Sequence, residues 1–256
     1  MQHRHVTPAL AVLSAALILA PAARAQVTMT PDGEWRALFT AGATVTGGNT
    51  RSNSVSLLGD VVKLTDMDKW AFNVNGQYAS SNGERTANSQ SATGLYTRDI
   101  TRRWFGFGQL DLLRDTMTDI QSRVTLGSGL GLHVIKETDN TWDVSAGLGY
   151  TWDRYEFPQL VDDAVRSSYE YPSLLLAEES NHKFTENTTV KQKLIVYPNL
   201  HDSGDVRTVF DTGISVTMTK RLALTATFEH RFDSRPGDSL GKNDTQLVTG
   251  VSLRLD

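Results

Sequence analysis

The sequence lacks cysteine altogether and has no large excess of one charge. Because none of its 256 residues is cysteine, a disulfide framework and every thiolate site are excluded. Lysine and arginine number 25 against 29 acidic residues, a formal net charge of −4, so no basic footprint for nucleic acid is present. Long apolar runs are scarce too. Residues 9–20 come nearest, and they are shorter than the ~20 residues of a membrane-spanning helix.

The first 25 residues carry an export signal. A basic start with Arg4 precedes the apolar run, and Ala23-Arg24-Ala25 has the form of a cleavage site. We therefore predict a secretory signal peptide over 1–25, a short periplasmic segment over 26–34 and one large domain over 35–256.

The sequence is rich in apolar–polar alternation. In WDVSAGLGYTW, from Trp142 to Trp152, one parity is apolar and the other is small or polar, which is typical of a strand with two unlike faces. The pattern recurs and predicts an all-β domain of about twelve strands. The expected spans are 35–46, 52–64, 69–80, 86–98, 103–115, 122–134, 141–154, 169–182, 188–197, 206–218, 221–233 and 244–255.

The length of these strands favours a membrane. Alternation alone also fits a soluble sandwich or a lipocalin-like barrel, but the expected strands run ~10 to 14 residues against ~5 to 6 in soluble proteins. Between Trp142 and Trp152 lie ~33 Å of strand, which rise roughly 23 Å at a ~45° tilt. Transmembrane barrels carry an apolar band ~25 Å tall between aromatic girdles. We predict an antiparallel up-and-down transmembrane β-barrel with Trp142, Trp152, Trp70 and Tyr78 at the membrane interfaces.

Connection lengths support the same interpretation. The connections after even-numbered strands are short, whereas residues 155–168, 198–205 and 234–243 follow odd-numbered strands and are the longest. Outer-membrane barrels have short periplasmic turns and longer outer loops.

The opposite parity should face the lumen. There we expect balanced charges that pair across the interior, beside the bulky Phe105, Phe107 and Leu58, so that the lumen is largely filled and conducts weakly. The predicted lumen charges are Asp60, Asp111, Arg123, Asp143, Lys191, Lys193, Arg207, Asp211, Glu229, Arg231 and Arg254.

Catalytic and metal motifs were sought in the loops and among the histidines. His201 and Ser203 share a presumed loop, where turn formation is the better interpretation. The histidines His133, His182, His201 and His230 lack metal-site spacing, and we expect His133 to face the lumen and His230 to lie near an interface. An acidic connection from Asp153 through Asp162 and Asp163 reads as a solvated loop, with divalent-cation or lipopolysaccharide contact as the alternative. We expect no catalytic residue, cofactor or metal.

Four stretches resemble one protein family, the YdiY-like salt-stress-induced outer-membrane proteins, which are built on a domain of unknown function. These stretches are GGNTRSNS at 47–54, residues 70–115, residues 126–156 and TKRLALTATFEHRFDS at 219–234. The resemblance implies an outer-membrane location and supplies no catalytic residue or ligand.

We therefore expect a non-enzymatic, monomeric outer-membrane barrel of the Gram-negative envelope, linked to osmotic or salt stress or to limited solute passage. Its expected partners are outer-membrane lipids, lipopolysaccharide and, during biogenesis, the barrel-assembly machinery, with no nucleic acid. The alternatives are a phospholipase-like barrel enzyme and a soluble periplasmic ligand-binding barrel.

Overall fold

All regular structure in the computed structural model is β-strand. The structure describes residues 31–46, 52–161, 164–236 and 241–255. The predicted signal peptide and residues 26–30 of the predicted periplasmic segment lie outside the described residues. The strands are β1 Trp35–Thr46, β2 Ser52–Leu64, β3 Asp68–Ser81, β4 Glu84–Asp99, β5 Trp104–Asp115, β6 Ile120–Lys136, β7 Asn140–Val161, β8 Ala164–Lys183, β9 Thr188–Pro198, β10 Val206–Thr217, β11 Leu222–Asp233 and β12 Asn243–Leu255. In the described part of the chain, no helix is long and apolar enough to cross a membrane.

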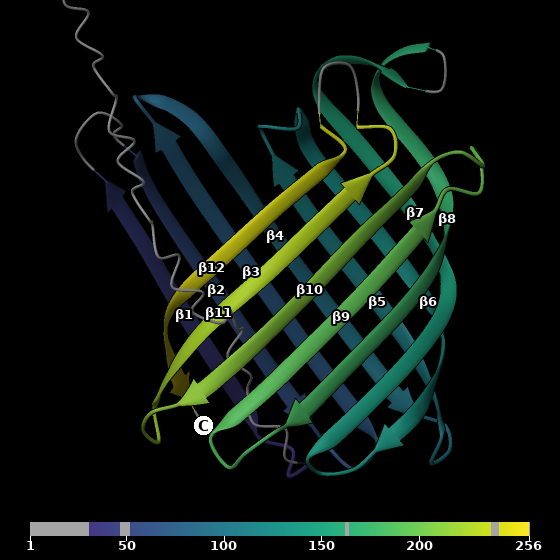
Figure 1. Ribbon diagram of the computed structural model, residues 1–256. Helices are drawn as coiled ribbons and strands as arrows, with labels where there is room; N and C mark the ends of the chain where they lie inside the picture. The colour runs from purple at the N-terminus through teal and green to yellow at the C-terminus, as the bar shows by residue number, and fades with distance from the viewer. Residues whose placement is uncertain (1–30, 47–51, 162–163, 237–240, 256) are drawn as a thin grey trace, which may run out of the picture.

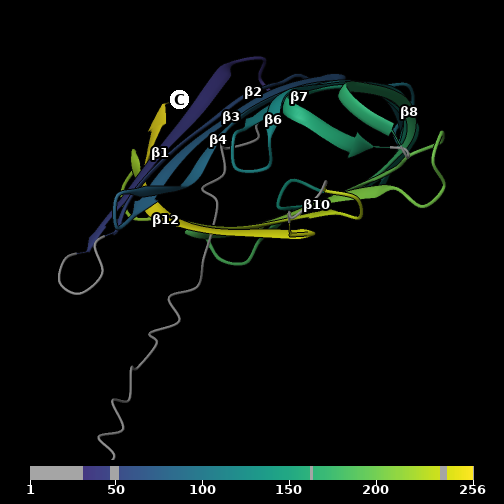
Figure 2. The same cartoon turned by 90° about the horizontal axis from the view of Figure 1, so that it is seen from above.

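The twelve strands form one closed barrel. Each strand pairs with its neighbours in sequence, and β1 pairs with β12 to close the ring, all antiparallel. In Figure 1, β9 to β12 cross in front of β1 to β6. From above, the outline is elongated, with β2, β3 and β4 on one side and β10 and β12 on the other (Figure 2). The predicted all-β, up-and-down, twelve-stranded barrel is confirmed.

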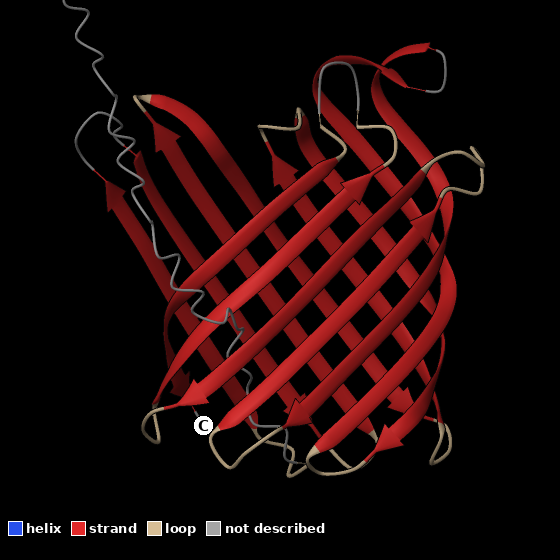
Figure 3. Cartoon of the chain, in the orientation of Figure 1, coloured by secondary structure: helices blue, strands red, loops and turns tan. Residues whose placement is uncertain are grey.

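Threonine recurs at the tight turns of one end of the barrel, drawn at the bottom of Figure 3 and called the lower end below. The side chain of Thr65 accepts a hydrogen bond from the amide of Asp68, and that of Thr101 accepts one from the amide of Trp104. Thr219 does the same for Leu222. A hydroxyl that caps an amide three residues on stabilises a tight turn. The odd-numbered strands β3, β5 and β11 therefore start from a repeated local signal.

The predicted loop over 155–168 is wrong. Strand β7 continues to Val161 and β8 begins at Ala164, with a register shift between Arg154 and Gln159. Pro158 lies in this irregularity, where the ladder does not require its missing amide donor. The hairpin therefore extends beyond its neighbours at the upper end of the barrel (Figure 1).

The two faces of the wall differ as in a membrane barrel. Outward side chains are large, apolar and exposed, among them Phe39, Leu57, Leu130, Leu148 and Leu247. Soluble monomers rarely expose so continuous an apolar surface, whereas transmembrane barrels require one. The interior instead buries hydroxyl, amide and charged groups together with a few apolar clusters.

Candidate functional site

Most of the buried polar and charged side chains of the described residues face the lumen. The strand registers place every predicted lumen charge on the inward parity. For example, the backbone register sets Lys193 opposite Glu179 on β8 and opposite Asp211 on β10. In the same way, the register sets Asp143 opposite His133, and Asp211 opposite Glu229. The predicted charges that lie on the inward parity are Asp60, Asp111, Arg123, Asp143, Lys191, Lys193, Arg207, Asp211, Glu229, Arg231 and Arg254.

A salt bridge crosses the lumen near its lower end. Lys69 Nζ on β3 lies 3.1 Å from Glu179 Oε1 on β8, and Lys191 Nζ on β9 lies 3.7 Å from the same oxygen. Four strands separate β3 from β8 around one side of the ring and six around the other, so these side chains come from opposite walls. Both are largely shielded from solvent, with 16% and 19% of their side-chain surface exposed. The opposing walls are therefore tied together by charge.

A second crossing joins β5 to β9 through Tyr197. Its hydroxyl accepts a hydrogen bond from Gln109 Nε2 at 3.1 Å and donates one to Asp111 Oδ2 at 3.1 Å. The guanidinium of Arg207, on β10, stacks 5.2 Å from the Tyr197 ring and 5.5 Å from the Tyr171 ring. Cations over aromatic faces are stabilised when shielded from water.

Apolar side chains pack the interior around these contacts. One cluster joins Leu38, Val62 and Ala223, and a larger one joins Phe105, Phe107, Leu175, Ile195 and Tyr197. The rings of Phe105 and Phe107 fit because glycines face them: a Cβ at Gly131 would come within 2.1 Å of the Phe105 ring. The glycines on the inward parity of β6 thus accommodate aromatic rings from β5.

The upper half of the lumen is more open. A cavity of about 220 Å³ is lined there by polar groups that include Ser91, Thr93, Asp111 and Arg123, and it reaches down to Lys191 beside the Lys69–Glu179 bridge. A water molecule occupies about 30 Å³ of liquid, so this cavity holds several. At its margin, Arg123 makes a two-pronged bond to Asp153, with N···O distances of 2.7 and 2.9 Å. Asp153, predicted to belong to a solvated acidic loop, is in fact a buried ion-pair partner.

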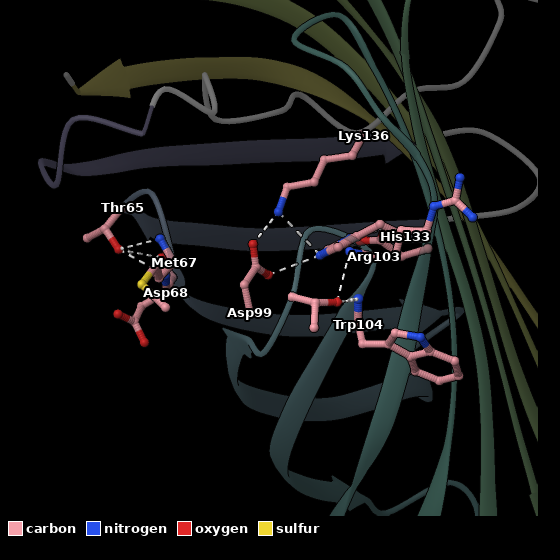
Figure 4. Close-up of polar contacts among 10 residues, drawn as sticks. Thr65, Met67, Asp68, Asp99, Arg103, Trp104, His133 and Lys136 are labelled. Carbon is pink, nitrogen blue, oxygen red and sulfur yellow. Dashed lines mark hydrogen bonds and ion pairs between the residues drawn. The ribbon is translucent and has the colours of Figure 1, made fainter.

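At the lower mouth of the lumen, His133 lies between two carboxylates. His133 Nδ1 is 2.7 Å from Asp143 Oδ1, and His133 Nε2 is 3.0 Å from Asp99 Oδ1. Figure 4 shows Lys136 and His133 converging on Asp99 from the same side. An imidazolium with two N–H donors satisfies both carboxylates. The inward position of His133 matches the expectation from its parity.

The remaining candidates do not form a reaction centre. Asn199 Oδ1 accepts hydrogen bonds from the amides of His201 and Asp202, and Gly204 donates to Asp202, so this loop is organised as a turn. His182 contacts Asn140, and His230 contacts Asn243. Within the described ranges, no group of three or more metal-ligating side chains is present.

The predicted girdle residues all lie on the outer surface. Trp142 and Trp152 are 38% exposed, Trp70 is 41% exposed and Tyr78 is 48% exposed. Trp35 and Trp104, which were not predicted, begin β1 and β5 and are also exposed. Four of the five tryptophans thus lie near the lower end, where odd-numbered strands start, and only Trp152 lies near the upper end.

The sequence interpretation missed Lys69, Glu179, Asp153 and Tyr197. The parity of Lys69 matches that of the inward Asn73, so it could have been assigned from β3 alone. Glu179 could not, because Leu174-Leu175-Leu176 followed by Glu178-Glu179 masks the alternation of β8. Tyr197 has the same parity as Lys191 and Lys193 on β9, so it could have been assigned to the lumen from that strand.

The chain matches one family model and several known proteins. The model described as "Protein of unknown function, DUF481" covers residues 39–253. "Uncharacterized protein YdiY" of Escherichia coli (strain K12) is 22% identical over 219 residues, covering 83% of this chain and 81% of that protein. Among solved structures, the NanC porin superposes with a TM-score of 0.46 at 13% identity, over 85% of this chain and 96% of that one. The KdgM porin in complex with disordered oligogalacturonate superposes with a TM-score of 0.43 at 11% identity, over 86% of this chain and 99% of that one.

Proposed function

This chain belongs to the DUF481 family of proteins of unknown function, and on that premise we propose that it is a non-enzymatic outer-membrane barrel closed to ion flow. It would contribute to envelope integrity under osmotic or salt stress rather than to bulk solute exchange. The observation that carries this proposal is the bridge from Lys69 to Glu179 between opposite walls.

The composition of the lumen supports closure. A selective pore would normally present a ring of one charge sign, whereas here opposite charges pair inside the barrel, as Lys69 does with Glu179 and Arg123 with Asp153. The apolar cluster around Phe105 and Phe107 removes further space on the same half of the barrel. Twelve strands leave room that side chains can fill or leave open, so the residues decide.

Planar-bilayer recording of the refolded protein tests closure. The wild type should give no stable, porin-sized steps, and the double variant Lys69→Ala/Glu179→Ala should leak several-fold more. Lys183→Ala/Asp139→Ala is the matched control, because that pair is exposed at a lower turn and crosses nothing. Porin-sized steps from the wild type would contradict the proposal.

Limited solute passage is the second candidate, favoured by the cavity of about 220 Å³ in the upper half. It predicts small, reproducible conductance steps from the wild type in the same recording.

A phospholipase assay addresses the enzyme alternative. We expect the wild type and the variant His201→Ala/Ser203→Ala to give the same result, because these residues form a turn and no reaction centre. Growth of a deletion strain at raised salt tests the stress link.

A further inference from the structure

The closing seam of the barrel differs from its other ladders. Strand β1 pairs with β2 over all 12 of its residues, but with β12 only from Ala37 opposite Leu255 to Ala41 opposite Val251. Above this point, residues 42–46 of β1 and 243–250 of β12 pair with no described strand on their facing edges. Figure 1 shows the two strands diverging toward the upper end.

The strands separate immediately after a close crossing. A Cβ at Gly42 would lie 2.8 Å from the carbonyl oxygen of Thr249, and one at Gly250 would lie 2.7 Å from that of Ala41. Below the crossing, Ser252 Oγ lies 2.7 Å from Thr40 Oγ1 and 3.0 Å from Thr225 Oγ1, so the seam is held by hydrogen bonds on its inner face. The opening is therefore confined to the upper half of the wall.

Open strand edges are costly in lipid. A spanning structure must satisfy its backbone polar groups internally, and unpaired backbone is tolerated only where it lines a polar cavity. The diverging edges of β1 and β12 should therefore communicate with the lumen rather than with hydrocarbon alone.

Two cavities share part of their lining in the wall beside the seam, and the outer one reaches the last β1–β12 pair, Ala41 opposite Val251, just below the opening. An outward groove of about 610 Å³ is lined by apolar side chains such as Phe39, Leu57 and Val251. The polar lumen cavity lies on the other side of the wall. The residues that line both lie on β2, β3 and β4, next to the seam strand β1, and are Leu58, Val74, Asn75 and Ser91.

We propose that the seam is a lateral binding site for an amphipathic lipid, whose acyl chain lies in the apolar groove and whose polar head enters the lumen cavity. The head group should offer a hydrogen-bond donor, because Asn75 Oδ1 is buried there without a hydrogen-bond partner and Asp60 lines the same cavity. Ligand sites usually span ~300 to 1,000 Å³, which the groove satisfies. The proposal needs only that the barrel lies in a membrane.

Fluorescence quenching tests the site, and the absence of native cysteine makes labelling selective. Bimane is attached at Ser91→Cys on β4, where the groove and the lumen cavity share their lining, or at Thr125→Cys, which faces the same lumen cavity from β6. The protein is placed in vesicles of phosphatidylethanolamine brominated on its acyl chains. Quenching should be several-fold stronger at residue 91. Equal quenching at both positions would overturn the proposal.

Blocking the groove provides the matched comparison. Gly76 lines the groove and Gly108 faces outward on β5, and a Cβ at either position meets nothing within 4 Å. Gly76→Trp should abolish most of the quenching at residue 91, while Gly108→Trp should leave it unchanged. Undiminished quenching in the Gly76→Trp protein would show that no lipid uses this groove.

Discussion

The lower and upper halves of the lumen obey the same alternation but are filled differently. In the lower half, Phe105, Phe107 and Leu175 pack against one another, and the Lys69–Glu179 pair crosses between walls. In the upper half, small and polar side chains such as Ser91 and Thr93 leave a cavity. Parity decides which side chains enter a barrel, and their volume decides whether it is closed.

The same contrast extends to the wall. At the lower end β1 and β12 are paired, and Leu38 packs inside the barrel with Val62 and Ala223. At the upper end the two strands separate. Packing of the interior and pairing of the seam thus coincide at the lower end of the barrel.

The largest expected effect is the difference in stability between two variants that place an arginine in the lower or in the upper half of the lumen. Ser145→Arg should destabilise by about 3 kcal/mol or more, since Ser145 is paired with Gly131 beneath the Phe105 ring and the new charge has no partner there. Ser91→Arg should cost far less, because Ser91 lines the cavity. Reversible unfolding from lipid vesicles measures both. Equal losses would erase the distinction between the halves.

A smaller effect is expected from one methyl group. Gly129→Ala should cost about 1 to 3 kcal/mol, because its Cβ would lie 2.2 Å from the Ala146 carbonyl oxygen and 2.8 Å from the Phe107 ring. The control Gly108→Ala has open space around it and should be neutral. The two variants can be compared by the temperature at which heating changes their migration on a denaturing gel, as expected when a closed barrel unfolds. A Gly129→Ala protein as stable as the control would argue against tight lower packing.

Prediction from sequence succeeded where periodicity was clear. Apart from β8, whose alternation is masked, the strands and the inward parity of the lumen charges follow from a period of two, and strand ends were accurate wherever a turn residue such as Thr65 or Thr219 intervened. The β7–β8 hairpin was misjudged because Pro158 and nearby charges resemble a loop, although tertiary pairing extends the strands past them.

Cross-lumen contacts could not be predicted at all. Periodicity assigns Lys69 to the inward face but leaves the direction of Glu179 undecided, and the contact between them depends on the shape of the closed ring. The same holds for the short β1–β12 ladder, because nothing local to β1 reveals how far a strand at the other end of the sequence will follow it.

The smallest predicted effect concerns the seam. Ser252→Ala removes the side chain that joins Thr40 to Thr225 and should cost about 1 kcal/mol, close to the net value of a hydrogen bond. Thr249→Ala, on the exposed face of the same strand, should change stability little. Urea unfolding of the two variants side by side decides it; indistinguishable midpoints would show that this hydroxyl chain does not hold the seam.

Sided labelling of single cysteines tests the division of the lumen most directly. Ser91→Cys reports the upper cavity, and Thr141→Cys, on the inward parity near the lower end of β7, reports the lower mouth. The orientation of the protein in the vesicles is first established by proteolysis. An impermeant maleimide added at the upper end should then label residue 91 and not residue 141. Added at the lower end, it should label residue 141 and not residue 91. Labelling of both positions from one side would contradict a closed lumen.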